Sequence, residues 1–210
     1  MGEHATYGKS WGLLDYLTEH NVPLIVAAVE CSRHAEDEPC GGRLSEYPPF
    51  DFSAKEWGNI KGRGELTMEF LVNDFKPEID ERWPTRPDRE HTLIAGSSMG
   101  GLMTLYAVME YNDTFSRGAA LSPSLGFDPE GVKAMISNAE ISETVLYMDM
   151  GQRELKRRSA KKNYAEVTAR LIGKGVLLES RIVPAGFHSE ASWERQIPFF
   201  LDTLLYNMEE

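Results

Sequence analysis

Short apolar runs alternate along the chain with longer stretches of helical periodicity. The apolar runs lie at residues 23–30, 91–95, 117–121, 144–150 and 176–183. The helical patterns lie at residues 11–20, about 65–81, 100–111, 129–137, 159–173 and 191–206. Strands that alternate with helices in this way predict a parallel sheet covered by helices on both faces. We therefore predict one α/β domain over residues 1–210, without repeats or a linker.

One strand-to-helix junction carries a candidate nucleophile. The apolar run at 91–95 is followed by the motif G-x-S-x-G at residues 96–100, and a helical pattern continues after it. In this context the motif is a nucleophile elbow, which holds its serine at the tip of a strained turn. Glycine has no Cβ atom, and we expect that a Cβ at Gly96 or Gly100 would clash where strand and helix approach closely. The junction predicts Ser98 as a nucleophile, and an ordinary helix cap is the alternative.

A serine nucleophile needs a base and an acid, and this motif predicts the acid before the histidine in chain order. His188 follows the predicted strand at 176–183. Glu154 comes just after the strand at 144–150, and Asp149, inside that strand, is the alternative acid. His188 would accept the serine proton, and the acid would fix the tautomer of the imidazole. Because Ser98, Glu154 and His188 each follow a predicted parallel strand, we expect them to meet at the carboxyl edge of the sheet.

Several motifs along the chain resemble the Putative esterase family of α/β-hydrolases. They are Gly62-Arg63-Gly64-Glu65-Leu66, Lys76-Pro77-Glu78-Ile79-Asp80, Gly96-Ser97-Ser98-Met99-Gly100-Gly101, Leu121-Ser122-Pro123-Ser124 and His188-Ser189-Glu190-Ala191-Ser192-Trp193. The family includes enterochelin-esterase-like, feruloyl-esterase-like and carbohydrate acyl esterase-like enzymes. The resemblance implies an α/β-hydrolase fold in which Ser98 and His188 are catalytic and Glu154 occupies the usual acid position.

The N-terminal part departs from the α/β-hydrolase pattern. The helical pattern at 11–20 corresponds to the first helix of the fold, so residues 23–30 and 91–95 are expected to be its fourth and fifth strands. The first three strands are then expected to be absent. The loop that supplies half of the oxyanion hole is expected to be absent as well. The Met99 N–H is expected to remain as one donor, and loss of one such donor costs about 10²–10³-fold in rate. A run as apolar as 23–30 belongs to a strand paired on both edges, which favours a homo-oligomer.

The long segment at 31–62 lacks periodicity and follows a predicted strand that ends near the predicted site. We expect it to be a substrate-facing cap in which Arg43, Glu46 and Tyr47 contact the substrate, and ordinary packing of its aromatic residues is the alternative. Cys31, His34 and Cys40 lack the fourth ligand and the spacing of a zinc site. We therefore predict no metal or other cofactor, and expect free thiols in a reducing cytoplasm rather than a disulfide.

The composition of the chain disfavours some classes of binding partner. With 33 acidic and 22 basic residues, the net charge is −11, which disfavours binding to nucleic acid or to an anionic membrane. No apolar run approaches the length of a membrane span.

The motifs and the composition together predict a cytoplasmic serine hydrolase that cleaves a small-molecule carboxylic ester through an acyl-enzyme. The alternative is a weakened or non-catalytic α/β-hydrolase scaffold that acts by binding or oligomerisation. The sequence is compatible with siderophore, feruloyl, acetyl-sugar and thioester substrates and does not distinguish between them.

Overall fold

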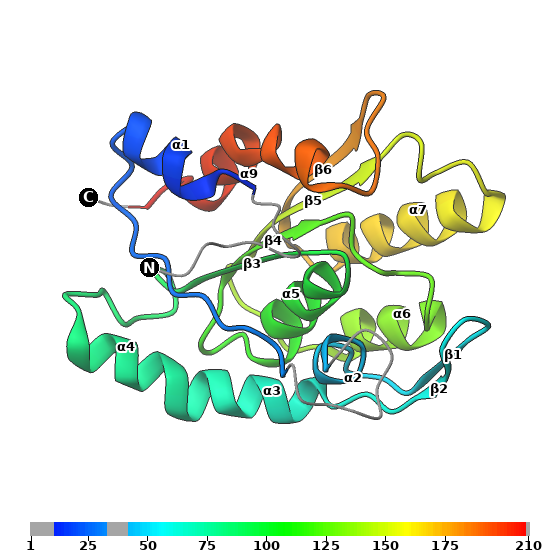
Figure 1. The fold of residues 1–210 in the computed structure, drawn as a ribbon, viewed down its shortest axis with the longest axis horizontal. Helices are drawn as coiled ribbons and strands as arrows, with labels where there is room; N and C mark the ends of the chain where they lie inside the picture. The colour runs from blue at the N-terminus through cyan, green and yellow to red at the C-terminus, as the bar shows by residue number, and fades with distance from the viewer. Residues whose placement is uncertain (1–10, 33–41, 209–210) are drawn as a thin grey trace.

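A four-stranded parallel sheet organises the fold (Figure 1). The structure, a computed structural model, describes residues 11–32 and 42–208. The strands are β3 (Leu93–Ser97), β4 (Arg117–Leu121), β5 (Val145–Gly151) and β6 (Leu177–Val183), side by side in that order. The helices α5 (Met99–Glu110), α6 (Pro129–Asn138) and α7 (Arg158–Gly173) connect them. Because neighbouring strands are parallel and follow chain order, all their carboxyl ends lie at one edge of the sheet.

The predicted strands at 91–95, 117–121, 144–150 and 176–183 are confirmed within two residues. The predicted helix at 11–20 is α1 (Leu13–Glu19), and the pattern at 65–81 is a continuous helical stretch of α3 (Gly64–Phe70), the π-helical η1 (Leu71–Phe75) and α4 (Lys76–Arg82). The predicted helix at 191–206 is divided into α8 (Glu190–Glu194) and α9 (Ile197–Leu204). Pro198 lies in the first turn of α9, where its missing N–H is tolerated, so the break falls just before it.

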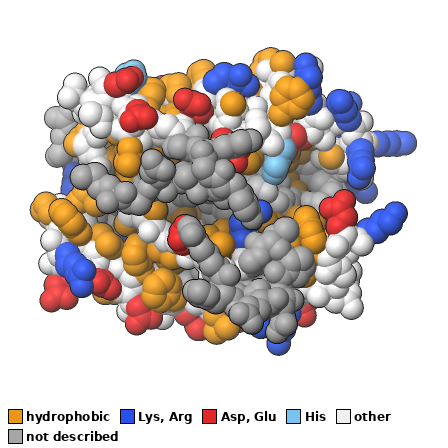
Figure 2. All heavy atoms as spheres, viewed as in Figure 1, with side chains coloured by type: hydrophobic (Ala, Val, Ile, Leu, Met, Phe, Trp, Pro, Cys, Tyr) orange, Lys and Arg blue, Asp and Glu red, His pale blue; other side chains and the backbone are white. Residues whose placement is uncertain are grey.

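The prediction of a strand at 23–30 is wrong. These residues have no regular secondary structure, and in the described ranges β3 is paired on one edge only, with β4. The side chains of Ile25, Val26 and Val29 are 48%, 36% and 41% exposed. Figure 2 shows hydrophobic side chains exposed over much of one face of the molecule, among acidic and basic ones. A strand requires a neighbour for its N–H and C=O groups, and apolar composition alone does not supply one.

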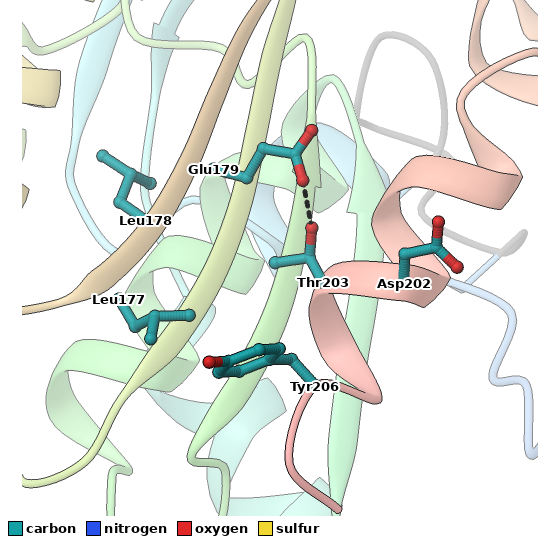
Figure 3. Close-up of a pocket in the computed structure, with 6 residues that line it drawn as sticks. All are labelled: Leu177, Leu178, Glu179, Asp202, Thr203 and Tyr206. Carbon is teal, nitrogen blue, oxygen red and sulfur yellow. Dashed lines mark hydrogen bonds between the residues drawn. The ribbon is translucent and has the colours of Figure 1, made fainter.

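The opposite edge strand, β6, borders a groove against α9 (Figure 3). The groove is lined by Leu177, Leu178, Glu179, Asp202, Thr203 and Tyr206. Across it, the Thr203 hydroxyl donates a hydrogen bond of 2.6 Å to the Glu179 carboxylate. Leu177 begins β6, so the groove lies toward the amino end of that strand and away from the carboxyl edge of the sheet.

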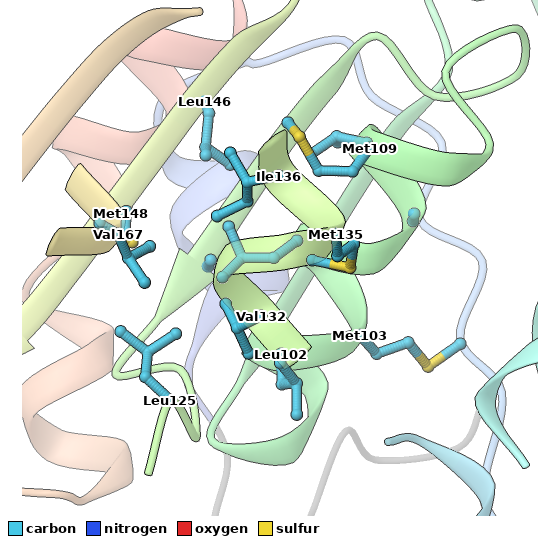
Figure 4. Packing of buried hydrophobic residues seen from close by; sticks show 14 of the residues in the cluster. Leu102, Met103, Met109, Leu125, Val132, Met135, Ile136, Leu146, Met148 and Val167 are labelled. Atoms are coloured by element: carbon cyan, nitrogen blue, oxygen red, sulfur yellow. The ribbon is translucent and has the colours of Figure 1, made fainter. Parts of the chain in front are cut away.

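Alternate residues of the two central strands face two separate cores. Ala120, Leu146 and Met148 pack in the larger core, to which α5, α6 and α7 contribute (Figure 4). Ala119 and Tyr147 pack in the second core, with residues of α1 and α9. Every residue of β4 and β5 is buried, which explains why these strands lack polar positions at every second residue. The prediction of helices on both faces of the sheet is therefore confirmed.

The segment at 31–62 contains short elements where the structure describes it. They are α2 (Arg43–Glu46) and an antiparallel hairpin of β1 (Phe52–Ala54) and β2 (Gly58–Ile60). The Phe52 ring packs on Phe127, with 4.5 Å between the centroids, so the hairpin covers the loop that follows β4. Strands of three residues are too short to show a period in the sequence. None of the helices in the described parts of the chain is long and apolar enough to cross a membrane.

Candidate active site

Ser98 occupies a strained turn between β3 and α5. Its φ of 59° and ψ of −117° lie in a region that residues other than glycine rarely adopt. Its N–H donates to the Leu121 carbonyl at the end of β4 (2.9 Å). Its carbonyl accepts from the N–H groups of Leu102 (3.1 Å) and Ser124 (3.0 Å). A serine held in a strained strand-to-helix turn has the geometry of a nucleophile elbow.

The glycines of the turn differ in what they contribute. A Cβ atom on Gly96 would collide with the backbone of Gly100, as expected from the motif. A Cβ atom on Gly100 would meet nothing within 4 Å, so the expected clash at that position is wrong. Gly101 is instead close-packed, because its Cβ would lie 3.0 Å from the Leu121 carbonyl oxygen and from the Pro123 Cα. The close approach therefore needs glycine at 96, and at 101 a Cβ would require the facing backbone to move by a few tenths of an ångström.

His188 lies between the serine and a carboxylate. Its Nε2 is 2.8 Å from Ser98 Oγ, and its Nδ1 is 2.6 Å from Glu154 Oε2. With the proton on Nδ1 donated to the carboxylate, Nε2 is left to accept the serine proton. The three residues follow β3, β5 and β6, so the carboxyl edge of the sheet brings them together. The side chain of His188 is 46% exposed and that of Glu154 is 14% exposed, so the histidine faces solvent and the acid lies behind it.

Contacts between two loops hold Glu154 beside His188. The Arg153 N–H donates to the Gly186 carbonyl (3.0 Å), and the Arg153 guanidinium lies 4.2 Å above the centroid of the Phe187 ring. The Glu154 N–H donates back to the Gly151 carbonyl (2.9 Å), which closes the turn after β5. The turn after β5 and the loop after β6 are therefore joined next to the acid, through Arg153.

Three hydrogen bonds keep Glu154 ionised. Oε1 accepts from the Ser122 hydroxyl (2.7 Å) and from the Gly151 N–H (2.9 Å), while Oε2 faces His188. Burial alone would raise the pKa of Glu154, but the hydrogen bonds from His188, Ser122 and Gly151 outweigh it and hold this pKa below its ordinary value. Glu154 is therefore a carboxylate at neutral pH, as an acid that orients an imidazole must be.

Asp149 has a different environment. It is 1% exposed and accepts from the Ser122 N–H (2.9 Å) and from the Tyr147 hydroxyl (3.1 Å). Burial raises the pKa of Asp149 to about 6. Its hydrogen bonds thus go to the end of β4 and to its own strand, and the carboxylate next to the His188 ring is that of Glu154.

Met99 is the first residue of α5. The first hydrogen bond of the helical ladder runs from the Leu102 N–H to the Ser98 carbonyl, so the Met99 N–H precedes the ladder. An N–H group at a helix N-terminus favours negative charge. The role of Met99 as an oxyanion donor stays a prediction that this position supports.

The residues expected to contact the substrate, Arg43, Glu46 and Tyr47, have different environments in the structure. The Glu46 carboxylate accepts from the Ser32 N–H at 3.0 and 3.2 Å. Tyr47 packs against the larger core, and burial, with smaller effects of Cys31 and Glu46, raises its pKa to about 12. Arg43 has a buried Nε without a hydrogen-bond partner among the residues described. Substrate contact by Arg43, Glu46 and Tyr47 stays a prediction.

The candidate metal ligands of the sequence lie partly outside the described structure. Cys31 is described and has a free thiol, whereas His34 and Cys40 fall in the range 33–41. No group of three or more potential metal ligands occurs in the described ranges.

Sequence reasoning missed two residues that contact the site. Ser122 donates to Glu154, and the Trp193 ring packs edge-on against His188, with 5.1 Å between the centroids and 85° between the planes. Both belong to motifs of the family resemblance, but those motifs gave no role to either side chain. The available signal was the position of Ser122 directly after a buried strand, at the same sheet edge as the candidate nucleophile.

The chain belongs to the Putative esterase family, whose family model matches residues 38–206. Its α/β fold, with a parallel sheet flanked by helices, is that of α/β-hydrolase esterases. A curated relative, the uncharacterized protein YbbA of Bacillus subtilis (strain 168), is 24% identical over 144 residues, which are 66% of this chain and 58% of YbbA.

Two solved structures show the same fold. The BES protein from Bacillus cereus superimposes with a TM-score of 0.63 at 19% identity, covering 77% of this chain and 63% of that protein. An IroE-like serine hydrolase from Shewanella oneidensis gives a TM-score of 0.62 at 18% identity, covering 77% of this chain and 55% of that protein. The chain thus spans less than two thirds of the length of each of these three proteins.

Proposed function

We propose that this chain is a serine hydrolase of carboxylic esters that works through an acyl-enzyme. The observation that carries the proposal is the hydrogen-bonded series from Ser98 Oγ through His188 to Glu154, with distances of 2.8 and 2.6 Å. The strained backbone at Ser98 and the membership of an esterase family support it independently.

In the proposed reaction, Ser98 Oγ attacks the ester carbonyl while His188 Nε2 takes the serine proton. His188 then gives this proton to the leaving alcohol, and the acyl group remains on Ser98. A water molecule next attacks the acyl carbonyl with His188 as its base, which releases the acid and returns the proton to Ser98. Glu154 keeps the imidazole in the correct tautomer and compensates its positive charge during both steps. The Met99 N–H would donate to the oxyanion.

The proposed substrate is a small-molecule ester, and the proposed location is the cytoplasm. The reaction needs no cofactor, because Ser98 carries the acyl group and His188 moves every proton, while Glu154 stays ionised. Screening short acyl esters with different alcohols is the direct route to the substrate.

A second candidate is a scaffold that acts by binding or oligomerisation. The observation that favours it is the combination of β3, paired on one edge only in the described ranges, with the exposed apolar residues at 23–30. The two candidates differ in whether Ser98 is reactive.

Labelling with a fluorophosphonate probe tests the proposal directly. We expect the wild-type chain and the control variant Ser97→Ala to be labelled, and Ser98→Ala to be unlabelled. Hydrolysis by Ser98→Ala should fall by up to about 10⁶-fold, the loss typical of a missing triad nucleophile. Unchanged hydrolysis in folded Ser98→Ala would contradict the assignment. A folded wild-type chain that neither reacts with the probe nor hydrolyses any ester would favour the scaffold.

A further inference from the structure

The side chain of Ser122 lies at the meeting point of three groups around the candidate active site. Ser122 directly follows β4, is 2% exposed and has a φ of 42°. Its hydroxyl is 2.7 Å from Glu154 Oε1, and the Trp193 indole N–H donates to the same hydroxyl oxygen at 3.1 Å. Its backbone N–H donates to Asp149 Oδ1 at 2.9 Å. One buried serine is therefore fixed by both carboxylates and by an aromatic ring.

The indole N–H determines where the Ser122 proton points. An indole nitrogen is a donor only, so Ser122 Oγ must accept the hydrogen bond from Trp193. A serine hydroxyl has one proton, and the remaining partner, the ionised Glu154, is an acceptor only. The Ser122 proton is thus directed at Glu154 Oε1. The hydrogen bond is made to a charged group in a buried setting, where such bonds are strongest.

Trp193 contacts the histidine as well as the serine. The Trp193 ring is 6% exposed and packs edge-on against the His188 ring, with 5.1 Å between the centroids. Asp149 in turn fixes the main chain of Ser122 in its left-handed conformation by accepting its N–H. The relative position of His188 and Glu154 therefore depends on Ser122 and Trp193, in addition to the direct hydrogen bond of 2.6 Å.

We propose that Ser122 is a positioning residue for Glu154, held by Trp193 so that one carboxylate oxygen is fixed and the other faces His188. This inference rests on the proposed function, because it gives Ser122 a task in the same reaction. Without the Ser122 hydroxyl, Glu154 Oε1 keeps only the Gly151 N–H, and the carboxylate gains freedom to turn away from the imidazole.

The kinetic test compares Ser122→Ala with Ser116→Ala. The two serines flank β4 at its opposite ends, and both are buried. The Ser116 hydroxyl donates to the Arg89 carbonyl, away from Ser98, His188 and Glu154. We expect Ser122→Ala to lower kcat about 10-fold and to change KM by less than about twofold, because orientation of the base matters in the transition state more than in substrate binding. Ser116→Ala should leave kcat unchanged. Equal losses of kcat in both variants, or none in Ser122→Ala, would overturn the inference.

Trp193→Phe tests whether the indole N–H of Trp193 orients the Ser122 hydroxyl. Phenylalanine keeps a ring near His188 but removes the N–H that Ser122 accepts. We expect a smaller fall in kcat, about threefold, and no further fall when Trp193→Phe is added to Ser122→Ala, because residues that act through one another are not additive. Additive losses would show that Trp193 does not act through Ser122.

An NMR measurement tests the role of Ser122 without depending on esterase activity. The proton on His188 Nδ1, in a hydrogen bond of 2.6 Å to a carboxylate, should give a downfield ¹H NMR signal. We expect this signal to move or broaden in Ser122→Ala and to be unchanged in Ser116→Ala. A wild-type chain without esterase activity would refute the proposed function, and the NMR signal would still decide the role of Ser122. If Ser122→Ala does not fold, Ser122→Cys, which keeps a weaker donor, should show an intermediate kcat, and an unchanged kcat would overturn the inference.

Discussion

Two carboxylates lie within five positions of each other in the chain, and their environments separate their roles. Asp149 is inside β5, where it is enclosed by the sheet and hydrogen-bonded to Tyr147 and Ser122. Glu154 lies beyond the strand end, where the chain turns back toward His188. Gly151 permits this turn, because a Cβ there would lie 2.6 Å from the Gly186 carbonyl oxygen and 2.7 Å from Glu154 Oε1. The position relative to the strand end therefore decides which carboxylate meets the histidine.

Amide substitutions of the two acids should separate them. We expect Glu154→Gln to lower kcat by about 10²–10⁴-fold, since the amide no longer compensates the imidazolium or fixes its tautomer. Asp149→Asn should cost much less, because the His188 ring keeps its carboxylate partner. The measurement is kcat on the best ester found by screening, with the circular dichroism of each variant as the folding control. An inactive Asp149→Asn beside a normal Glu154→Gln would reverse the assignment.

At the scale of elements, local signals predicted most of the fold that positions the site. The elbow was predictable because β3, the glycines and α5 are consecutive, and each has its own pattern in the sequence. The strands β4 and β5 were predictable because burial on both faces makes them uniformly apolar or small. The same reasoning failed at 23–30, where an equally apolar run has no paired neighbour in the described structure. Pairing is a long-range property, and no residue within the run encodes it.

The elbow itself offers a matched pair of substitutions. Gly96→Ala places a Cβ against the backbone of Gly100, so strand and helix must move apart. We expect it to lower the free energy of unfolding by about 1–3 kcal/mol, the usual range for overpacking. Gly100→Ala places its Cβ in open space within the first turn of α5 and should be neutral or stabilising by up to about 1 kcal/mol, because alanine favours helix. Urea unfolding measures both, and equal destabilisation would contradict the packing argument.

At the scale of the whole molecule, the site could be predicted better than its surroundings. Ser98, His188 and Glu154 were predictable as candidates because parallel strands bring their carboxyl ends to one edge, whatever the loops do. Ser122 and Trp193 were not predictable as contacts of the site, because their contacts join the end of β4 to α8 across 71 positions of sequence. Whether Arg43, Glu46 and Tyr47 face the substrate also depends on how a segment without periodicity folds, and no local pattern settles that.

The edge of β3 leads to a prediction about assembly. Among residues 11–32 and 42–208, β3 pairs only with β4, and the free edge of such a strand is a template for another chain. The exposed Ile25, Val26 and Val29 add apolar surface that association would cover. We expect the purified chain to self-associate in a concentration-dependent way, and light scattering at several protein concentrations measures this. Ile25→Lys should shift the equilibrium toward the monomer, because a charge on the apolar segment must be desolvated in the assembly. The exposed Leu66→Lys on α3 is the control and should leave the equilibrium unchanged. A well-folded chain that stays monomeric at every concentration would show that the sheet is stable with β3 at its edge.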